Sequence, residues 1–461
     1  MKNSVQDLEL ALAETPIIDM HTHLVGGRLA ARGLHDVLLY HMVVTEVYSA
    51  GCPSGQRLTE YPGWPDREEA RQRILEALPY LRHAQNTGIA WCLRIIFADL
   101  YGWNQPITAD NWQRLDDMIR ERADDFAWSH SILDRVNIRR SATELARRRT
   151  GEDDERLQYV LEWAMFNRCQ WGEFDTALYE LERCWGQPPG SPSPIGGKNR
   201  PTPQRAIRSV ADVHEAMRYY VKTIPLDQVC ATASSFSSEI DYSLVNDSQM
   251  ESAMARRSQA GIAERDIYAS YILEAFLSEL EKIGDKIVYQ FAIGAEPLPF
   301  ETGSVLPQRT IAQLSGIIAR HPKLRFQCFL ASRHGNQALC TLVRELPNLS
   351  LAGYWWHNFF PDIIRQVMAE RVDMLPSNKQ IGFFSDAYCV EWTYGKAILV
   401  RKILAQVLAQ KIEQGQQTMA QALDFSRAIL FDSPQTLLGM TPRQTARKGG
   451  TKPEVEEVGV K

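Results

Sequence analysis

Two histidines near the start of the chain, His21 and His23, are separated by one residue within PIIDMHTHLVGG (16–27). Residues two apart on a β-strand point to the same face, so both imidazoles can converge on a single point. Imidazole nitrogens are ligands for zinc and other first-row divalent ions, but two such ligands alone bind a metal weakly. The pair therefore predicts a metal site that needs a third ligand, against the simpler interpretation of a solvated histidine pair.

The third ligand is expected to be Asp386, which ends the apolar run IGFFSD (381–386). In a closed barrel the first and last strands are neighbours, so this carboxylate would lie beside His21 and His23 although it is far from them in sequence. A metal ion held by one carboxylate and two imidazoles keeps open positions for water or a substrate oxygen. That arrangement is typical of a catalytic site and not of a structural one.

The later half of the chain alternates between short apolar runs and helical patterns. The apolar runs lie at 286–297, 323–335, 348–358 and 380–388, and each ends in small or polar residues. The segments between them carry apolar residues at the spacing of an amphipathic helix. This alternation favours a parallel sheet, and at 461 residues the natural arrangement is a (β/α)8 barrel.

The predicted fold class is α/β, a distorted (β/α)8 TIM-type barrel with a large helical insertion after the first strand. The chain divides accordingly into an N-terminal helix with the first barrel strand (1–27), a helical insertion (28–130), the remainder of the metal-dependent barrel (131–440) and a disordered tail (441–461). The arginine-rich run RRSATELARRRT (139–150) is interpreted as an exposed helix face.

The composition argues against several classes of protein. A formal net charge of −5 gives no basic surface for nucleic acid. No apolar run is long enough to span a membrane, and the N-terminal residues lack the apolar core of a signal peptide. The 8 cysteines are scattered without CxxC pairs, so we expect free thiols, a reducing compartment and a cytoplasmic location. The expected partner is therefore a small molecule.

The run IIDMHTHL (17–24) resembles the first-strand metal motif of the amidohydrolase superfamily. From about residue 15 to 410, the chain resembles the uronate isomerase branch of that superfamily. The matching segments are QFAIGA (290–295), GYWWHN (353–358) and FFSDAY (383–388), in the order and at the spacing of that branch. The resemblance implies the same barrel with one divalent metal ion, either zinc or another first-row ion such as manganese.

The activity that the resemblance implies is the conversion of a hexuronate aldose, such as glucuronate or galacturonate, to the ketose. The proton moves between C2 and C1 through an enediol, whose negative charge needs a metal or oriented donors. His21, His23 and Asp386 are the implied metal ligands, and Asp386 is also the implied proton carrier. His41, in LLYHMVV (38–44), matches a histidine of the family's helical insertion and is a candidate catalytic residue; a buried core histidine is the alternative.

The candidate substrate-binding residues follow the predicted strands. They are Trp355, Trp356, His357, Asn358, Arg333 and Tyr388. The two tryptophans are adjacent, so on a strand only one of them can line the pocket and the other belongs to the core. Glu296 and Lys396 are further candidates for contact with the pocket, with a turn and a solvated lysine as their respective alternatives.

The substrate pocket departs from the family pattern at two positions. Ala292 stands where the family has a strand histidine, and Tyr388 stands where it has an arginine two residues after the closing aspartate. A neutral phenol cannot replace the planar guanidinium that binds a carboxylate at two points, so Arg333 is considered in its place. The metal ligands are thus kept while the pocket differs.

Three functions therefore stay open. The first is a uronate isomerase-like enzyme that acts on a hexuronate or a related sugar acid. The second is a metal-dependent hydrolase or decarboxylase that activates water on the same metal. The third is a sugar-binding protein without turnover, because a fold alone does not fix the function. A homo-oligomer is compatible with the sequence, which leaves the oligomeric state open.

Overall fold

The computed structural model describes residues 2–53, 67–148, 154–162, 174–187, 203–284, 286–297, 302–304 and 306–439. The predicted tail, 441–461, lies outside these ranges. Within them, eight strands form one parallel sheet, and β6 (Ala295–Pro297) pairs with β7 (Thr302–Ser304) apart from it. In spatial order the strands of the sheet are β1 (Ile17–Thr22), β2 (Ile138–Glu144), β3 (Leu157–Glu162), β4 (Val229–Ser235), β5 (Val288–Ile293), β8 (Arg325–Leu330), β9 (Leu349–Ala352) and β10 (Gln380–Ile381).

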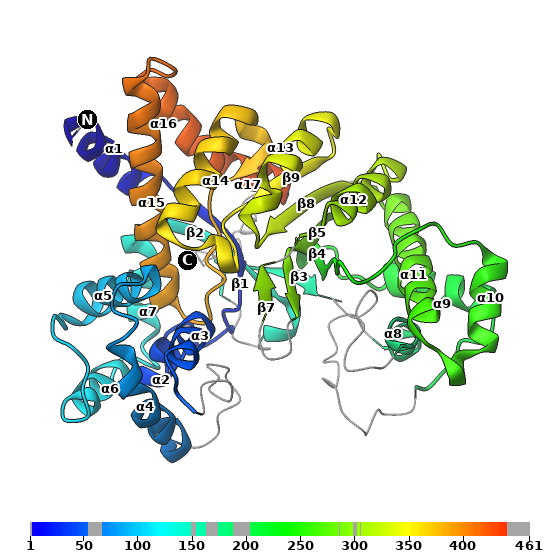
Figure 1. Cartoon of the computed structure of the whole chain (residues 1–461), viewed down its shortest axis with the longest axis horizontal. Coiled ribbons are helices and arrows are strands. Elements are labelled where there is room, and N and C mark those ends of the chain that lie inside the picture. The colour runs from blue at the N-terminus through cyan, green and yellow to red at the C-terminus, as the bar shows by residue number, and fades with distance from the viewer. Residues whose placement is uncertain are drawn as a thin grey trace, which may run out of the picture.

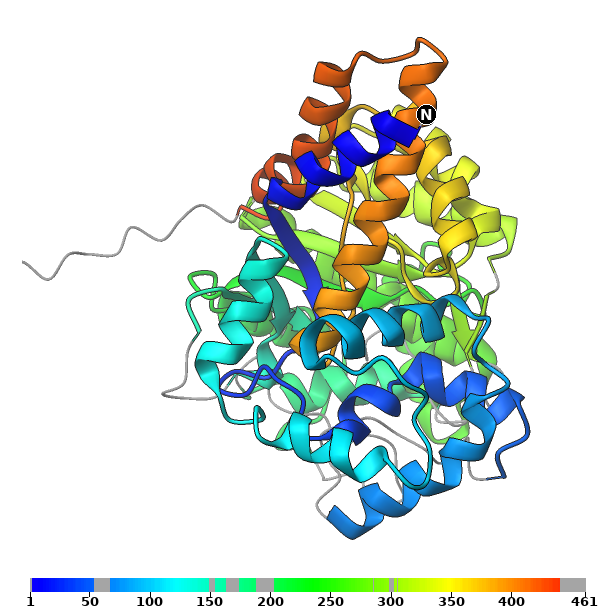
Figure 2. The same ribbon diagram turned by 90° about the vertical axis from the view of Figure 1, so that its left-hand side faces the viewer.

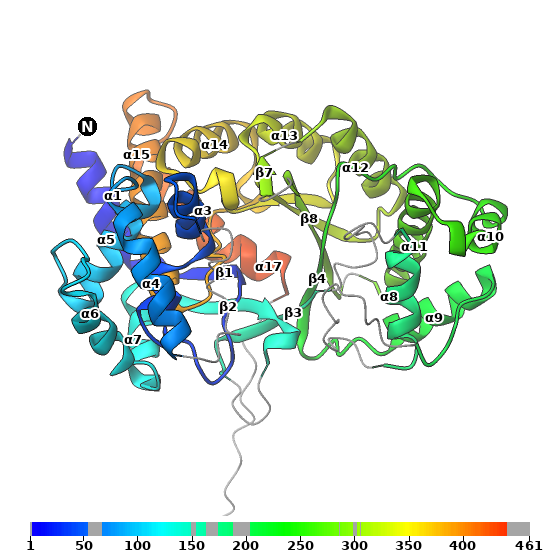
Figure 3. The same cartoon turned by 60° about the horizontal axis from the view of Figure 1, so that its bottom comes forward.

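The barrel closes through the segment that follows β10. β10 itself has only 2 residues and pairs with β9. Beyond it, the backbone N–H of Asp386 donates to the carbonyl of His21 (2.9 Å), and the N–H of His23 donates to the carbonyl of Ala387 (2.8 Å). The chain after β10 therefore runs beside the end of β1, and the predicted distorted TIM-type barrel is confirmed. The curl of the sheet is visible in Figure 3.

Helices cover the outside of this sheet. Those that follow the later strands are α12 (Gln308–Arg320), α13 (Asn336–Glu345), α14 (Pro361–Met374) and α15 (Val390–Glu413) (Figure 1). A second group stands to one side of the sheet and consists of α8 (Thr176–Cys184), α9 (Val210–Lys222), α10 (Asp247–Ala255) and α11 (Ile262–Lys282) (Figure 1). The first described helix, α1 (Lys2–Glu14), packs against α16 (Met419–Arg427). The π-helical turn η7 (Ala428–Asp432) and α17 (Ser433–Leu437) follow α16.

The elements that the structure describes between β1 and β2 are all helices. They are α2 (Leu34–Leu38), α3 (His41–Ser49), α4 (Arg67–Leu81), α5 (Gly88–Tyr101), α6 (Trp112–Arg120) and α7 (Phe126–Arg135). Figure 2 shows β1 running towards this group, so the helices gather where the first strand ends. α15 crosses both regions, because it packs against α1 and α14 and also against α5 and α7.

Two apolar layers hold the barrel. On β1, Ile17 faces the surrounding helices, whereas Ile18 and Met20 join a cluster inside the barrel. This alternation is expected of a strand that is buried on both faces. α17 lies within the curve of the sheet (Figure 3), and Leu437 and Leu438 at its end pack against the interior cluster. The end of the barrel where the strands begin is thereby closed by the last described helix.

The interpretation of 139–150 as an exposed helix face is wrong. Residues 138–144 form β2, which pairs with β1 on one side and β3 on the other. The next three residues form the 3-10 turn η2 (Leu145–Arg147), and Arg147 is only 7% exposed. The arginines interrupt the apolar alternation by which a strand is recognised in the sequence. β2 is stabilised instead by backbone hydrogen bonds to β1 and β3, which the sequence pattern of one segment does not report.

Two further observations concern the whole chain. None of the described helices combines the length and the apolar character needed to cross a membrane. The seven cysteines in the described part of the chain are all free and buried. The expected free thiols are therefore present at those seven positions.

Candidate metal centre

Three side chains that the sequence singled out meet at one end of the barrel. The Nε2 atoms of His21 and His23 lie 3.4 Å and 3.2 Å from Oδ1 of Asp386. A ligand atom from each residue lies within 4.8 Å of the other two. Tetrahedral ligands at the usual zinc distances lie roughly 3.3–3.6 Å apart. Two imidazoles and one carboxylate at this spacing fit a single divalent ion.

β1 is irregular where it carries the histidines. Its pairing with β2 shifts register between Asp19 and Thr22. Strict alternation from Met20, which faces the barrel interior, would turn His21 outward. Instead the His21 ring lies 5.3 Å from the ring of Phe329, a member of the interior cluster. Irregularities of this kind re-aim side chains at the rims of barrels, which is how both histidines come to face the same carboxylate.

Asp386 is held in a strained backbone conformation. Its φ of 53° lies in the left-handed region, which costs a non-glycine residue about 1–3 kcal/mol. Its N–H donates to the carbonyl of His21, and its own carbonyl accepts a hydrogen bond from the Tyr40 hydroxyl (2.9 Å). The Lys396 ammonium donates in turn to that hydroxyl (2.6 Å). Asp386, the predicted third ligand, is thus positioned jointly by β1, by the residue that precedes α3 and by α15.

The charges in the cluster favour an ionised carboxylate. Burial raises the pKa of Asp386, but hydrogen bonds from His21 and His23 hold that pKa well below its usual range. Burial lowers the pKa of His23, but the carboxylates of Glu144 and Asp386 raise it to about 10. A divalent cation at this point would compete with the proton of His23 for the same nitrogen.

His23 has a second carboxylate partner that sequence reasoning missed. Its Nδ1 lies 2.9 Å from Oε1 of Glu144, the last residue of β2. Arg147 pairs with the same carboxylate and approaches His23 Nδ1 at 3.4 Å. A hydrogen bond from Nδ1–H to Glu144 leaves the Nε2 lone pair for a metal, as is usual for ligating histidines. Reading 138–144 as a strand would have placed Glu144 at a strand end and marked it as a candidate.

Tyr388, at the position of the expected arginine, packs directly against a predicted ligand. Its ring stacks on that of His23 at a centroid distance of 4.5 Å and an angle of 22°. The guanidinium of Arg147 lies 5.2 Å from the centre of the Tyr388 ring. A guanidinium is therefore present beside this aromatic side chain, but it comes from η2 and not from the closing segment.

His41 lies on the other side of Asp386. Its Nε2 is 3.8 Å from Oδ2 of Asp386, while Oδ1 faces the two β1 histidines. His41 is the first residue of α3, and its ring lies 4.6 Å from that of Trp356. The structure thus brings His41 to the cluster instead of burying it in the core of the insertion.

The two tryptophans do not lie on a strand, whereas the expectation that only one of them lines the pocket assumes that they do. β9 ends at Ala352, so neither tryptophan is on a strand. Trp356 begins the 3-10 turn η5 (Trp356–Asn358) with a φ of 48°, and its ring meets that of Trp355 edge-on at 6.3 Å. Trp355 packs against the cluster inside the barrel, and Trp356 packs against His41.

Two other candidates are engaged elsewhere. Arg333 is exposed and donates to the side chain of Gln366 on α14 (2.7 Å). Asn358 is fully buried and donates to the carbonyl of Leu330 at the end of β8 (2.8 Å), which is a structural role. The side chains of two further candidates, His357 and Glu296, lie outside the described part of the structure.

Lys396 is neither solvated nor a direct part of the cluster. It is 1% exposed, and its ammonium lies 4.7 Å from the ring centre of Tyr40 and 4.6 Å from that of Phe359. Burial lowers its pKa, whereas the nearby carboxylates of Asp386 and Asp19 raise it. Its hydrogen-bonded connection to Asp386 runs through Tyr40, and its charge also acts on the Asp386 carboxylate, whose pKa it lowers.

Solved structures align with this fold over almost the whole chain. A uronate isomerase from Bacillus halodurans C-125 aligns with a TM-score of 0.68 over 95% of this chain and 96% of its own, at 18% identity. A uronate isomerase from Thermotoga maritima gives 0.70 over 95% and 97% at 12% identity. A glucuronate isomerase from Caulobacter crescentus gives 0.73 over 96% and 95% at 14% identity.

A fourth structure, a Lactobacillus casei protein named as a metal-dependent hydrolase, gives a TM-score of 0.58 over 94% of this chain and 97% of its own, at 14% identity. No family model matches the sequence, and no curated protein is significantly similar to it. Identities this low show a shared fold and nothing further. The resemblance to the uronate isomerases is thus confirmed at the level of the fold.

Proposed function

We propose that this protein is a divalent-metal-dependent enzyme that interconverts the aldose and ketose forms of a hexuronate or a related sugar acid. The observation that carries the proposal is the convergence of His21, His23 and Asp386 where the strands of a barrel end. Active sites of such barrels occupy that end. The fold shared with uronate isomerases supports the choice of reaction.

The donor set fits one divalent ion, for which we propose zinc, with manganese or another first-row ion as the alternative. His21, His23 and Asp386 would hold it. When bound, the ion would supply the positive charge that stabilises the enediolate oxygens. Glu144 orients the His23 ring for this role through its hydrogen bond to Nδ1.

The two carboxylate oxygens of Asp386 have different neighbours and are assigned different roles. Oδ1 faces the two histidine ligands, and Oδ2 faces His41. We assign to Oδ2 the transfer of the carbon-bound proton from C2 of the aldose to C1, which yields the ketose. His41 moves the hydroxyl proton in the same sense, from the C2 oxygen to the C1 oxygen, so that each proton removed from the C2 side is delivered to the C1 side.

The remaining side chains shape the substrate pocket. Trp355, Trp356 and Tyr388 provide aromatic surfaces beside the cluster, and sugars pack their C–H faces on such rings. Arg147 is proposed as the cation that faces the substrate carboxylate, because its guanidinium lies against the Tyr388 ring. His357 stays a candidate at the same turn.

The test is isotope exchange with the metal-loaded protein. Glucuronate and galacturonate are incubated with it in deuterated water. Incorporation of deuterium at the carbon that receives the transferred proton is followed by NMR, together with formation of the ketose. We expect exchange that is lost in His21→Ala and Asp386→Asn and kept in His334→Ala, a matched change of an exposed histidine. Stoichiometric metal in the wild type without exchange on any uronate would contradict the isomerase.

A metal-dependent hydrolase or decarboxylase is the second candidate. It is favoured by the replacements at Tyr388 and Ala292 and by the fold shared with a protein named as a metal-dependent hydrolase. Its expected signature is hydrolysis or carbon dioxide release that depends on the same three ligands. A protein that binds a sugar acid equally well without metal would support the third alternative, a binding protein without turnover.

A further inference from the structure

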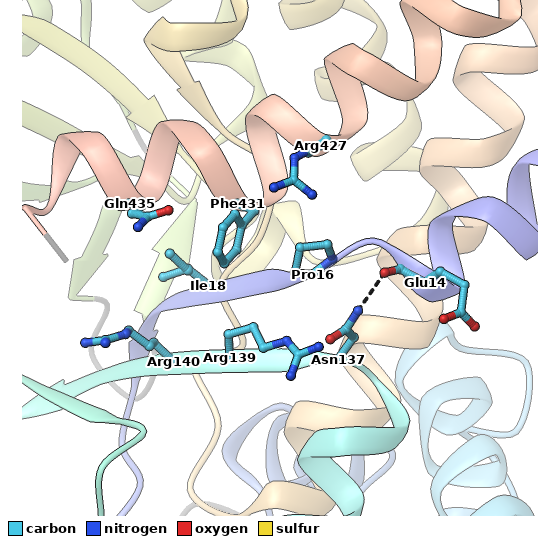
Figure 4. Close-up of a pocket in the computed structure, with 9 residues that line it drawn as sticks. All are labelled: Glu14, Pro16, Ile18, Asn137, Arg139, Arg140, Arg427, Phe431 and Gln435. Atoms are coloured by element: carbon cyan, nitrogen blue, oxygen red, sulfur yellow. Dashed lines mark hydrogen bonds between the residues drawn. The ribbon is translucent and has the colours of Figure 1, made fainter. Parts of the chain in front are cut away.

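A second pocket lies at the opposite end of β1 from the metal centre. It has a volume of about 520 Å³ and lies between the beginnings of β1 and β2 and the segment from α16 to α17 (Figure 4). Cavities of roughly 300–1,000 Å³ are typical of small-molecule sites. Its lining residues are Glu14, Pro16, Ile18, Asn137, Arg139, Arg140, Arg427, Phe431 and Gln435.

The lining is strongly cationic. Three of its side chains are arginines and one, Glu14, is an acid. The Glu14 carboxylate points away from the pocket in Figure 4, and its charge acts on the buried guanidinium of Arg401, whose pKa it raises against the larger lowering effect of burial. The charge of Glu14, the only acid of the lining, therefore acts on Arg401, which is not part of the lining.

The two arginines that flank the start of β1 lack a strong partner. Arg139 is exposed, and no acid of the described chain lies within ion-pair distance of it. Arg427 meets Asp432 at 3.5 Å, but both side chains are about half exposed (55% and 51%), so the pair contributes little in water. The guanidinium of Arg427 also lies 5.5 Å from the ring centre of Phe431, on the same lining. Both arginines line the same pocket, Arg139 from β2 and Arg427 from α16 on the other side of β1 (Figure 4), and a lining with several like charges favours an anion.

The floor of the pocket is apolar. Ile18 is 1% exposed, and Phe431 packs beside it while its ring faces the pocket in Figure 4. A single phosphate ion would contact the arginines but leave this floor and most of the volume uncovered. The ligand that matches both features has an anionic group and an apolar or planar body.

We propose that this pocket binds an organic phosphate, with the phosphate group at Arg139 and Arg427 and the apolar body against Phe431. A phosphate monoester carries nearly two negative charges near neutral pH and can accept paired hydrogen bonds from two guanidinium groups. A carboxylate would leave one of the two arginines uncompensated. The site is separate from the metal centre and does not depend on the proposed isomerase activity.

The test is isothermal titration of the full-length protein at fixed ionic strength with phenyl phosphate, inorganic phosphate and benzoate. We expect phenyl phosphate to saturate one site and to bind at least tenfold more tightly than either other probe. Arg139→Gln and Arg427→Gln should each weaken binding about tenfold, because each removes one guanidinium. Phe431→Leu should reduce the advantage of phenyl phosphate over inorganic phosphate.

Arg218→Gln, a matched change at an exposed arginine on α9, should leave the affinity unchanged. His21→Ala should also leave it unchanged, which distinguishes this pocket from the metal centre. Arg139 and Arg427 are both exposed, so their variants should keep the wild-type Tm. The proposal is overturned if phenyl phosphate does not saturate, or if Arg139→Gln and Arg427→Gln bind it as tightly as the wild type does.

Discussion

At the scale of single residues, His23 contacts a carboxylate through each ring nitrogen. Nε2 lies 3.2 Å from Asp386 and Nδ1 lies 2.9 Å from Glu144. The first carboxylate is a proposed ligand, whereas the second fixes which nitrogen carries the proton and how the ring is turned. The proposed chemistry of the site therefore depends on a residue that is not among the proposed metal ligands.

Glu144→Gln should weaken metal affinity by about 10–100-fold, the range for a lost partner of a ligating histidine. The amide keeps the shape of the side chain but removes the charge that favours the proton on Nδ1. Competition with a chelator of known affinity measures the dissociation constant. Glu155→Gln, an exposed acid in the turn before β3, is the control and should bind metal as the wild type does. An unchanged constant in Glu144→Gln would exclude this role.

At the scale of elements, the site is a junction between the barrel and the helical insertion. Tyr40 precedes α3 and joins Lys396 of α15 to the carbonyl of Asp386. α3 is joined in turn to α5, because Glu46 accepts a hydrogen bond from Thr87 (2.9 Å), which caps α5. A chain of hydrogen bonds and helix contacts therefore joins the insertion to Asp386, the proposed third ligand.

Tyr40→Phe removes the hydroxyl between Lys396 and Asp386. A buried ammonium and a buried carbonyl then each lose a partner, so the free energy of unfolding should fall by about 1–3 kcal/mol. Urea denaturation followed by circular dichroism measures the change. Tyr48→Phe on α3, the helix that Tyr40 precedes, changes a tyrosine that is 37% exposed and should alter stability by less than about 0.5 kcal/mol. Equal effects of the two substitutions would contradict the assigned role.

Glu46 should make stability depend on pH. Burial raises the pKa of Glu46 from 4.5 to about 7, although the hydrogen bond from Thr87 lowers it. The folded state therefore holds this proton more tightly than the unfolded chain between those two values. Stability from this group is present below pH 4.5 and is lost as pH rises through 7.

Glu46→Gln removes the loss of stability at high pH, because the amide does not ionise. Relative to the wild type, the variant should gain about 1–3 kcal/mol more at pH 8 than at pH 5, after allowance for solvent screening of a half-buried group. Urea midpoints at the two pH values measure the difference. Glu121→Gln, at an exposed acid that ends α6, should show no such difference. A gain that is equal at both pH values would show that Glu46 titrates normally.

At the scale of the whole molecule, the insertion and the barrel meet along α5 and α15. Gly395 lies in the middle of this contact, inside α15. A Cβ atom there would come within 2.7 Å of Ile96 and 2.8 Å of Cys92 on α5, closer than real Cβ contacts allow. The absence of a side chain thus lets the two helices approach, and the insertion is held against the strand ends that carry the site.

Gly395→Ala should destabilise the protein by about 1–3 kcal/mol, because the added methyl group must displace packed atoms. Gly316→Ala is the matched control within another helix, where the nearest atom is the flexible end of Arg320 at 3.3 Å. That change should be neutral or stabilise by up to about 1 kcal/mol through helix propensity. Thermal unfolding of both variants measures the contrast, and a neutral Gly395→Ala would show that α5 and α15 are packed loosely.

The sequence by itself determined the candidate metal ligands and the class of fold. His21 and His23 are recognisable because ligand type and spacing are local properties, and the later strands follow from apolar runs between helical patterns. The pairing of Asp386 with these histidines followed from the rule that a barrel's first and last strands adjoin. The free thiols at the described cysteines also agree with the sequence.

Only the tertiary structure decided how the site is completed. The contact of Glu144 with His23, the contact of Trp356 with His41 and the stacking of Tyr388 on His23 all join distant segments. The irregular pairing of β1 and the positive φ of Asp386 are likewise imposed by hydrogen bonds to other elements. Periodicity reports which face of one element is apolar, but it carries no information on which polar partner another element brings to that face.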